Sequence, residues 1–305
     1  MINWVKKGLV FCPEAQFPSM HTHAANPFAV PTADPDIFRV YFTCRDQQSR
    51  SAISYCEMNA ADNFKVIYVH DQPVLEPGEP GLFDDSGVAT GFIINYGGQI
   101  LLYYLGWNLK VTVPWLNTIG LAIWSDAEGK FIKQSRVPVM DRSEEDPFTI
   151  SYPSIMEENG VLRMWYGSNL RWGKTQETMQ HIFKYAESED GRDWKRFSRT
   201  VVDLTHPGEY ALSKPFVIKK SDIYHMWYSY RGNGDIQTYR IGYARSQDGV
   251  NWERLDKIAG IDVSPSGWDS EMICYPDIFE YRGKLVMLYN GNGYGRTGFG
   301  VATEE

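Results

Sequence analysis

One short apolar motif recurs five times along the chain at nearly constant spacing. Successive copies begin 62, 62, 62 and 61 residues apart. A strand-like, aromatic repeat of this length is typical of blades arranged around an axis, since one small sheet cannot bury both of its faces alone. We therefore expect an all-β fold, a five-bladed β-propeller of four-stranded antiparallel blades. The copies are Val40-Tyr41-Phe42, Leu102-Tyr103-Tyr104, Met164-Trp165-Tyr166, Met226-Trp227-Tyr228 and Met287-Leu288-Tyr289.

The repeats account for the whole chain, which favours one domain over residues 1–305. A two-sheet sandwich and a solenoid are the alternatives, and a solenoid would need capping repeats, which the sequence lacks. Acidic residues outnumber basic ones by 38 to 30, giving a net charge of −8. Such a charge repels nucleic acid and anionic membranes, so we expect neither as a partner. The first ten residues resemble no signal peptide, no apolar run reaches 18 residues and the four cysteines show no pairing pattern, so we expect a cytoplasmic location.

Each repeat divides into four short strands, which we name A to D from the axis outward. Strand A carries the same pattern in every repeat, with a proline or glycine at one position: Pro27, Gly91, Pro153, Pro215 and Pro276. A proline repeated in this way suits the start of a strand, where one backbone donor is dispensable. We therefore expect these prolines at strand starts that face the axis.

Turn signals and the two ends of the chain define the outer strands. Asp190-Gly191 and Asp248-Gly249 precede Trp194 and Trp252 by three residues, which predicts hairpins between strands C and D. The chain ends on a strand C, Phe299-Gly300-Val301-Ala302, with no strand D behind it. Because Asn3-Trp4 repeats the Asn251-Trp252 pair, we expect the N-terminal strand to complete the last blade.

The two faces of such a wheel differ in sequence. The A-to-B and C-to-D turns are short, whereas the loops that lead into strand A or leave strand B are long, polar and aromatic. Binding sites are usually built from loops of this second kind, although plain solvated loops are the alternative. We therefore expect the functional site on this face.

Every repeat places a carboxylate or an imidazole just before strand A. If these acids converge on one funnel they raise one another's pKa and divide into a general acid and a general base. The alternative is that they are turn and cap residues, which suits aspartate better than Glu209 or Glu271. Two histidines make no complete ligand set, so we expect no metal and no cofactor. The positions are His21, His23, Asp84, Asp85, Glu145, Asp146, Glu209, Asp269 and Glu271.

The whole chain resembles the five-bladed propeller glycosidases, the arabinanase, levansucrase and invertase superfamily that includes glycoside hydrolase families 43, 32 and 130. The match is to a poorly characterised branch, and it implies an acid, a base and a third carboxylate around the axis. The strings that carry the resemblance are Phe83-Asp84-Asp85-Ser86-Gly87-Val88, Leu105-Gly106-Trp107-Asn108, Trp227-Tyr228-Ser229-Tyr230-Arg231-Gly232, Trp268-Asp269-Ser270-Glu271-Met272 and Gly291-Asn292-Gly293-Tyr294-Gly295-Arg296-Thr297-Gly298.

Three positions depart from the family 43 arrangement. The position of its base, in an Asp-Pro pair, is held here by Asn26, and an amide cannot accept the proton. The positions of the tuning carboxylate and the acid are held by Phe92 and Ser213. The branch therefore either draws its carboxylates from the residues before strand A or keeps only a sugar pocket.

Our leading hypothesis is a glycoside hydrolase-like enzyme acting on a small or modified saccharide or oligosaccharide, with Glu271 as proton donor, Asp85 as base and Glu209 as the tuning group. Phosphorolysis is a variant, because four cations near the mouth are able to bind an anion. The rival from another class is a non-catalytic glycan or nucleotide-sugar binding propeller associated with polysaccharide biosynthesis. A bare protein-binding scaffold is a third reading. The predicted substrate-binding residues are the stacking residues Trp107, Tyr230 and Tyr294, the hydrogen-bonding residues Asn108, Asn290 and Arg231, the further cations Arg45, Lys214 and Arg296, and His21, His23, Asn26, Asp84, Tyr152 and Asp277.

Overall fold

The computed structural model describes residues 2–173, 179–232, 234 and 236–305. Strands make up a little over half of the described chain, which has almost no helix, and antiparallel pairing divides the strands into five sets of four. Set 1 is β2 (Thr22–Pro31), β3 (Ile37–Arg45), β4 (Ser51–Asn59) and β5 (Lys65–Val69). Set 2 is β6 (Gly87–Tyr96), β7 (Gln99–Leu109), β8 (Trp115–Ser125) and β9 (Lys130–Lys133).

The remaining sets follow the same order. Set 3 is β10 (Ile150–Glu158), β11 (Val161–Arg171), β12 (Gln180–Ser188) and β13 (Lys195–Val202). Set 4 is β14 (Ala211–Lys220), β15 (Ile223–Arg231), β16 (Arg240–Ser246) and β17 (Trp252–Arg254), followed by the short helix η2 (Asp256–Ile258). Set 5 is β18 (Cys274–Tyr281), β19 (Lys284–Asn290), β20 (Phe299–Glu304) and β1 (Trp4–Phe11), with the one-turn helix α1 (Asn292–Gly295) before β20.

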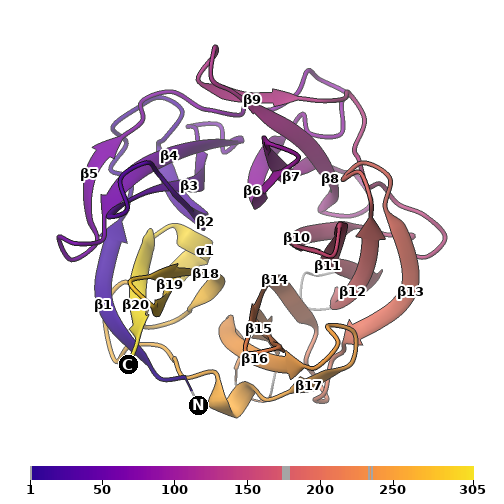
Figure 1. The fold of residues 1–305 in the computed structure, drawn as a ribbon. Coiled ribbons are helices and arrows are strands. Elements are labelled where there is room, and N and C mark those ends of the chain that lie inside the picture. The colour runs from indigo at the N-terminus through magenta and orange to yellow at the C-terminus, as the bar shows by residue number, and fades with distance from the viewer. Residues whose placement is uncertain (1, 174–178, 233, 235) are drawn as a thin grey trace.

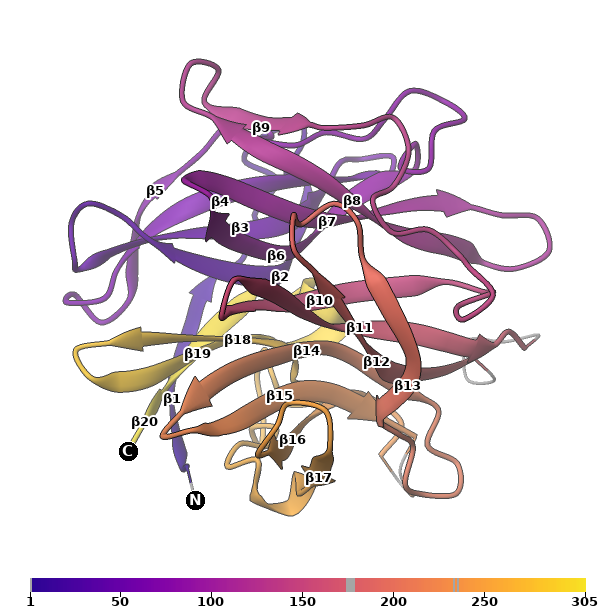
Figure 2. The same ribbon diagram turned by 45° about the vertical axis from the view of Figure 1, so that its right-hand side comes forward.

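Set 5 is built from both ends of the chain. β1 pairs antiparallel with β20, from Trp4 opposite Glu304 to Phe11 opposite Phe299. Figures 1 and 2 show β1 running along the outside of β20, next to the two termini. This pairing is the one predicted from the similarity of Asn3-Trp4 to Asn251-Trp252, and it covers the edge that β20 would otherwise expose.

The five sets stand around a common centre, which we call the hub (Figure 1). The first strand of each set, namely β2, β6, β10, β14 and β18, is the innermost, and each contacts the next in cyclic order. The repeated motif of the sequence lies on the second strands, where Trp165, Trp227, Tyr104 and Tyr166 are fully buried between sets. The spacing of the motif therefore reports the second strand of every set.

The Asp-Gly turns join the third and fourth strands of sets 3 and 4, as predicted. Gly191 and Gly249 have φ of 74° and 76°, a conformation that glycine adopts without strain. Their carbonyls accept hydrogen bonds from the preceding set, Gly191 from the Tyr103 hydroxyl at 2.8 Å and Gly249 from the Trp165 indole at 2.6 Å. Each turn therefore also fastens one set to its neighbour.

Candidate active site at the hub

Four first strands carry the same backbone irregularity near the hub. In β2, β10, β14 and β18 two residues oppose a single residue of the second strand, which is a β-bulge. The first residue of each bulge has a positive φ, 52° at Asn26, 36° at Tyr152, 48° at Lys214 and 57° at Tyr275. We call these four residues the hub ring. A positive φ is costly for a residue other than glycine, and such strain is concentrated at functional sites.

The proline after each ring residue occupies the second position of its bulge. The expectation that these prolines start the strands is wrong, because β2 begins at Thr22, five residues before Pro27. A bulge interrupts the ladder of backbone hydrogen bonds, so proline costs no donor there. Set 2 has its register shift between Thr90 and Phe92, with Gly91 at the bulge instead of proline.

The hub ring makes contacts across the centre. The rings of Tyr152 and Tyr275 lie 5.5 Å apart, and the Tyr152 hydroxyl contacts the Asn26 side chain. The Lys214 ammonium donates to the Pro276 carbonyl at 3.3 Å. Ring residues from sets 1, 3, 4 and 5 thus meet at one place.

Three buried polar atoms near the ring have no hydrogen-bond partner among the described residues. They are Asn26 Oδ1, Asp277 Oδ1 and Arg231 Nε, on residues that are 2%, 1% and 5% exposed. Buried polar groups in folded proteins are nearly always satisfied, so each such exception calls for an explanation. A polar ligand or bound water at the hub would supply the missing partners.

Asp277 is a carboxylate of the hub and follows Tyr275 by two residues on β18. Its Oδ2 accepts from the Ala29 backbone at 3.0 Å, which ties set 5 to set 1. Burial raises the pKa of Asp277 and lowers the pKa of Lys214, while the charge of each partner opposes the shift of the other. These opposite shifts bring the pKa of the acid and the pKa of the base closer together, as is common for acid–base groups in active sites.

Cations flank the hub on the side of sets 1 and 5. Arg45 ends β3, Arg296 follows α1, and His23 is close enough to both for their charges to act on it. Burial, reinforced by the charges of Arg45 and Arg296, lowers the pKa of His23 to about 4, so this imidazole is neutral at physiological pH. His21 lies further out, where it lines a rim cavity of about 330 Å³.

Hydrocarbon closes the hub below the ring. Phe28, Phe92 and Phe216 pack against one another with ring centroids 5.0, 6.0 and 5.6 Å apart. They directly follow the bulges of β2, β6 and β14, and Asp277 holds the equivalent position after the bulge of β18, so this layer carries a buried carboxylate in set 5. Phe92, which stands where the resemblance implies a tuning carboxylate, belongs to this plug.

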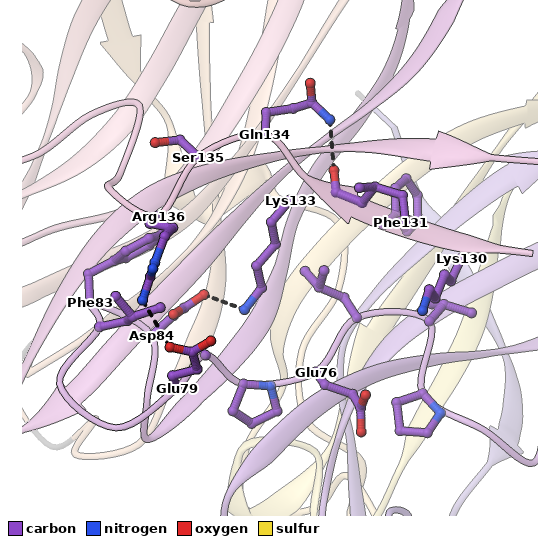
Figure 3. Close-up of a pocket in the computed structure, with 17 residues that line it drawn as sticks. Glu76, Glu79, Phe83, Asp84, Lys130, Phe131, Lys133, Gln134, Ser135 and Arg136 are labelled. Atoms are coloured by element: carbon purple, nitrogen blue, oxygen red, sulfur yellow. Dashed lines mark hydrogen bonds and ion pairs between the residues drawn. The ribbon is translucent and has the colours of Figure 1, made fainter. Parts of the chain in front are cut away.

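The carboxylates predicted to converge at the hub are mostly bound within their own sets. Asp84 is 1% exposed and pairs with Lys133 at 2.6 Å, beside an outer cavity of about 600 Å³ between the β5–β6 loop and β9 (Figure 3). Glu209 is 3% exposed and pairs with Arg254, the last residue of β17, which is the outermost strand of set 4. These two residues are not placed with the hub ring.

An ion pair of this kind recurs in four sets and joins an acid that precedes the first strand to a cation on the fourth strand. In sets 2, 3 and 5 the acid also accepts from the tyrosine of the repeated motif. In set 4 that tyrosine, Tyr228, instead donates to Asp256, which shares Arg254 with Glu209. The acid–cation–tyrosine groups are Asp84–Lys133–Tyr104, Asp146–Arg196–Tyr166 and Asp269–Lys6–Tyr289, and the set 4 pair is Glu209–Arg254.

Asp85 and Glu271 have different surroundings. Burial acts to raise the pKa of Asp85, but hydrogen bonds from Asn108, Gly81 and Ser86 outweigh it, and the pKa is lowered. A carboxylate held ionised in this way is a weak base. Glu271 is exposed on the loop before β18, and its carboxylate has no hydrogen bond or ion pair with any described residue.

Four other residues predicted to bind substrate make contacts within the protein, where they hold loops in place or pack in the interior. The Trp107 indole donates to Ser51 at 2.8 Å, and Asn108 donates to the Leu82 carbonyl at 2.6 Å. Tyr230 is buried beneath the guanidinium of Arg254. Asn290 is fully buried and its Oδ1 accepts from the Asn26 backbone at 2.8 Å, so it supports the bulge of β2.

Three residues that lie at or beside the hub were not predicted from the sequence. Tyr275 occupies the same position before proline as Tyr152 and Lys214, so the repeat alignment contains the signal for it. Tyr239 packs 6.0 Å from Tyr275, and His181 lies near Arg231, where burial lowers its pKa to about 3. Nothing in the repeat distinguishes these last two.

No group of three or more His, Cys, Asp or Glu side chains among the described residues is placed to hold a metal ion. No helix in the same residues has the length and apolar character needed to cross a membrane.

Comparison with known proteins places the chain among relatives. No family model matches it. It is 46% identical over 303 residues to the uncharacterized protein Rv1502 of Mycobacterium tuberculosis (strain ATCC 25618 / H37Rv), which covers 99% of both chains. It is 28% identical over 138 residues, 43% of each chain, to a 1,2-beta-oligomannan phosphorylase of Thermoanaerobacter sp. (strain X514).

Solved structures share the fold at low sequence identity. One, a glycoside hydrolase, has a TM-score of 0.79 at 16% identity over 98% of this chain and 91% of that one. Another comes from work on glycoside hydrolases of the GH130 family that target beta-1,2 mannosidic linkages, with a TM-score of 0.69 at 13% identity over 99% and 93% of the two chains. The chain shares its all-β fold with solved structures described as glycoside hydrolases, and it belongs to the family of Rv1502.

Proposed function

We propose that this protein is a saccharide-active enzyme of the glycosidase type and that its substrate binds at the hub. In this proposal the five sets are the blades of one five-bladed propeller domain over residues 1–305. The observation that carries it is the hub ring, because four strained residues from four sets converge on buried polar atoms that lack partners. Strain and unsatisfied groups gathered at one centre are expected of a site that is completed by its ligand.

The chemistry we propose is carboxylate acid–base catalysis in the central funnel. A proton donor must keep its proton near neutral pH, and burial raises the pKa of Asp277 in that direction. Glu271, exposed before β18 on the same face, is the second candidate for this role. Asp85 and Glu209 are less suited, since both are engaged by several hydrogen bonds within their own sets.

Phosphorolysis is the form of the reaction that one observation favours over hydrolysis. Hydrolysis needs a base that takes a proton from water, and the position that the resemblance gives to this base holds Asn26. Phosphate is already an anionic nucleophile and needs no such base. The cations Lys214, Arg45 and Arg296 around the hub suit the binding of phosphate.

The substrate and the location belong to the same proposal. A small saccharide or oligosaccharide is the substrate class, and the partial match to a 1,2-beta-oligomannan phosphorylase makes β-1,2-linked manno-oligosaccharides the first compounds to test. All four cysteines are free thiols, which supports the expected cytoplasmic location. A glycan or nucleotide-sugar binding protein without turnover is the alternative.

The experiment compares product formation from these oligosaccharides with and without inorganic phosphate. We expect sugar 1-phosphate in the presence of phosphate, and a fall of at least about 100-fold in turnover for Asp277→Asn, the low end for lost acid catalysis. Lys214→Met should weaken the binding of phosphate, and Lys220→Met is its matched control, because Lys220 is half exposed and its ion pair among the described residues is with Glu304. Release of free sugar without phosphate would establish hydrolysis, and binding without any product would favour the alternative.

A further inference from the structure

Arg231, at the end of β15, is enclosed by aromatic rings. Its guanidinium lies 5.0, 4.5 and 5.9 Å from the ring centroids of Tyr210, Tyr239 and Tyr294. Its Nη1 donates to the Tyr294 hydroxyl at 2.7 Å, and its Nε has no partner among the described residues. We call these four residues the Arg231 cage.

The cage differs from the sites of the other largely buried arginines in the described chain. Arg163 pairs with Glu158 at 2.8 Å, Arg196 with Asp146 at 3.1 Å, and Arg254 with both Glu209 and Asp256. Arg231, only 5% exposed, forms no ion pair with any described residue. A buried charge is stable only when it is paired, so the cage calls for an anion from outside the described chain.

The titratable neighbours of Arg231 do not supply this anion. Burial raises the pKa of Tyr239 to about 12 and raises the pKa of Cys274 above its usual value, so both are neutral at physiological pH. Tyr275 has its pKa raised in the same way. His181 is also neutral, because burial and the nearby guanidinium lower its pKa to about 3. The cage is therefore a buried positive charge surrounded by aromatic rings.

The cage lies beside the hub ring but further from the axis. Arg231 is on β15, the second strand of set 4, whereas Lys214 of the hub ring is on the innermost strand β14. Aromatic contacts connect the two places, with Tyr239 6.0 Å from Tyr275 and Tyr275 5.5 Å from Tyr152. A saccharide over the hub ring would extend along these rings toward Arg231.

We propose that the Arg231 cage binds an oxyanion carried by the saccharide itself, a carboxylate or a phosphate ester, so that the substrate is an acidic saccharide. This inference deepens the proposed function and rests on it. The guanidinium presents a planar pair of donors that matches the oxygens of either group. The tyrosines exclude water and contact the sugar next to the acidic group.

The test measures the binding of matched acidic and neutral sugars by tryptophan fluorescence and ligand-observed NMR. The probes are D-glucuronic acid against D-glucose, D-mannose 6-phosphate against D-mannose, and inorganic phosphate alone. We expect each acidic sugar to bind at least about 10-fold more tightly than its neutral counterpart, as a charge-assisted hydrogen bond implies. Arg231→Gln should remove this difference.

Two further variants keep the test decisive. Arg245→Gln is the matched control, because Arg245 lies in the same set, is half exposed and pairs with Glu253. Tyr294→Phe removes one hydrogen bond from a half-buried residue and should weaken acidic sugars several-fold even if Arg231→Gln fails to fold. Circular dichroism monitors the fold of each variant.

Each other outcome overturns the inference in a distinct way. Equal binding of acidic and neutral sugars, or an acidic preference that survives Arg231→Gln, would remove the oxyanion site while leaving the proposed function in place. Inorganic phosphate that binds as tightly as the acidic sugars, displaces them and depends on Arg231 would make the anion free phosphate instead of a sugar substituent. Failure of every saccharide to bind or react would remove the proposed function as well.

Discussion

Replacing Glu209 by alanine should cost stability and leave the chemistry at the hub unchanged. Glu209 is 3% exposed and accepts from Arg254 Nη1 at 2.8 Å and from the Thr205 backbone at 2.8 Å. Removing one partner of a buried ion pair costs about 3 to 5 kcal/mol, because the other charge is left without compensation. Arg254 still keeps Asp256 at 2.8 Å, so we expect the lower end, about 3 kcal/mol.

Urea unfolding followed by tryptophan fluorescence, together with thermal unfolding, measures this loss. A loss of this size should lower Tm by roughly 5 °C in a chain of this length. Glu253→Ala is the control, since Glu253 lies on β17 beside Arg254 but is 58% exposed, and it should change the free energy of unfolding by less than about 0.5 kcal/mol. If Glu209→Ala instead unfolded like Glu253→Ala while its turnover fell at least about 100-fold, the structural reading of this carboxylate would be refuted in favour of the catalytic one.

Three further outcomes are expected. Hydrogen bonds from Lys219 and Tyr224 lower the pKa of Glu158 to about 2, so its contribution to stability is complete above its unfolded pKa and is lost as the pH falls from about 4.5 to 2; Glu158→Gln should flatten the unfolding free energy against pH over that window. Asn26→Asp adds a negative charge among the hub cations and should raise the KM for phosphate about 10-fold, and an unchanged KM would place phosphate elsewhere. Phe92→Ala opens the hydrocarbon plug and should cost about 3 to 5 kcal/mol in urea unfolding, whereas a loss under about 1 kcal/mol would show that the plug is loosely packed.

The strand pattern of the fold could be predicted from the sequence because the repeat encodes burial. The motif around Trp165 and Trp227 repeats wherever a second strand packs between two sets, and that requirement recurs with every set. The Asp-Gly turns are similarly local, since Gly191 needs its positive φ whatever surrounds it. The pairing of β1 with β20 was predictable from the resemblance of Asn3-Trp4 to an internal fourth strand.

The site was less predictable, because the direction of a side chain and its bonding partner depend on residues that are far apart in the sequence. The offset of Asp84 before its strand is visible in the sequence, but its partner Lys133 is 49 residues away on another strand. The sequence alignment therefore placed these acids at equivalent positions of the sets, but it did not show that their side chains pair with the fourth strands instead of pointing to the hub. The bulges had a visible cause, the repeated proline, yet only the backbone shows that the residue before it is turned to the centre, which is why Tyr275 was missed.

At the bulges the backbone geometry stays the same while the side chain, and with it the chemistry, differs from set to set. Asparagine, lysine and two tyrosines, at positions 26, 214, 152 and 275, share the same bulge geometry, so this geometry does not depend on one type of side chain. A single codon change, such as Asn26→Asp, can thus install a new reactive group in an already assembled centre. Descendants of one such scaffold are free to acquire, exchange or lose reactions without passing through an unfolded ancestor, and a mutant library confined to these four positions would sample many chemistries while most of its members still fold.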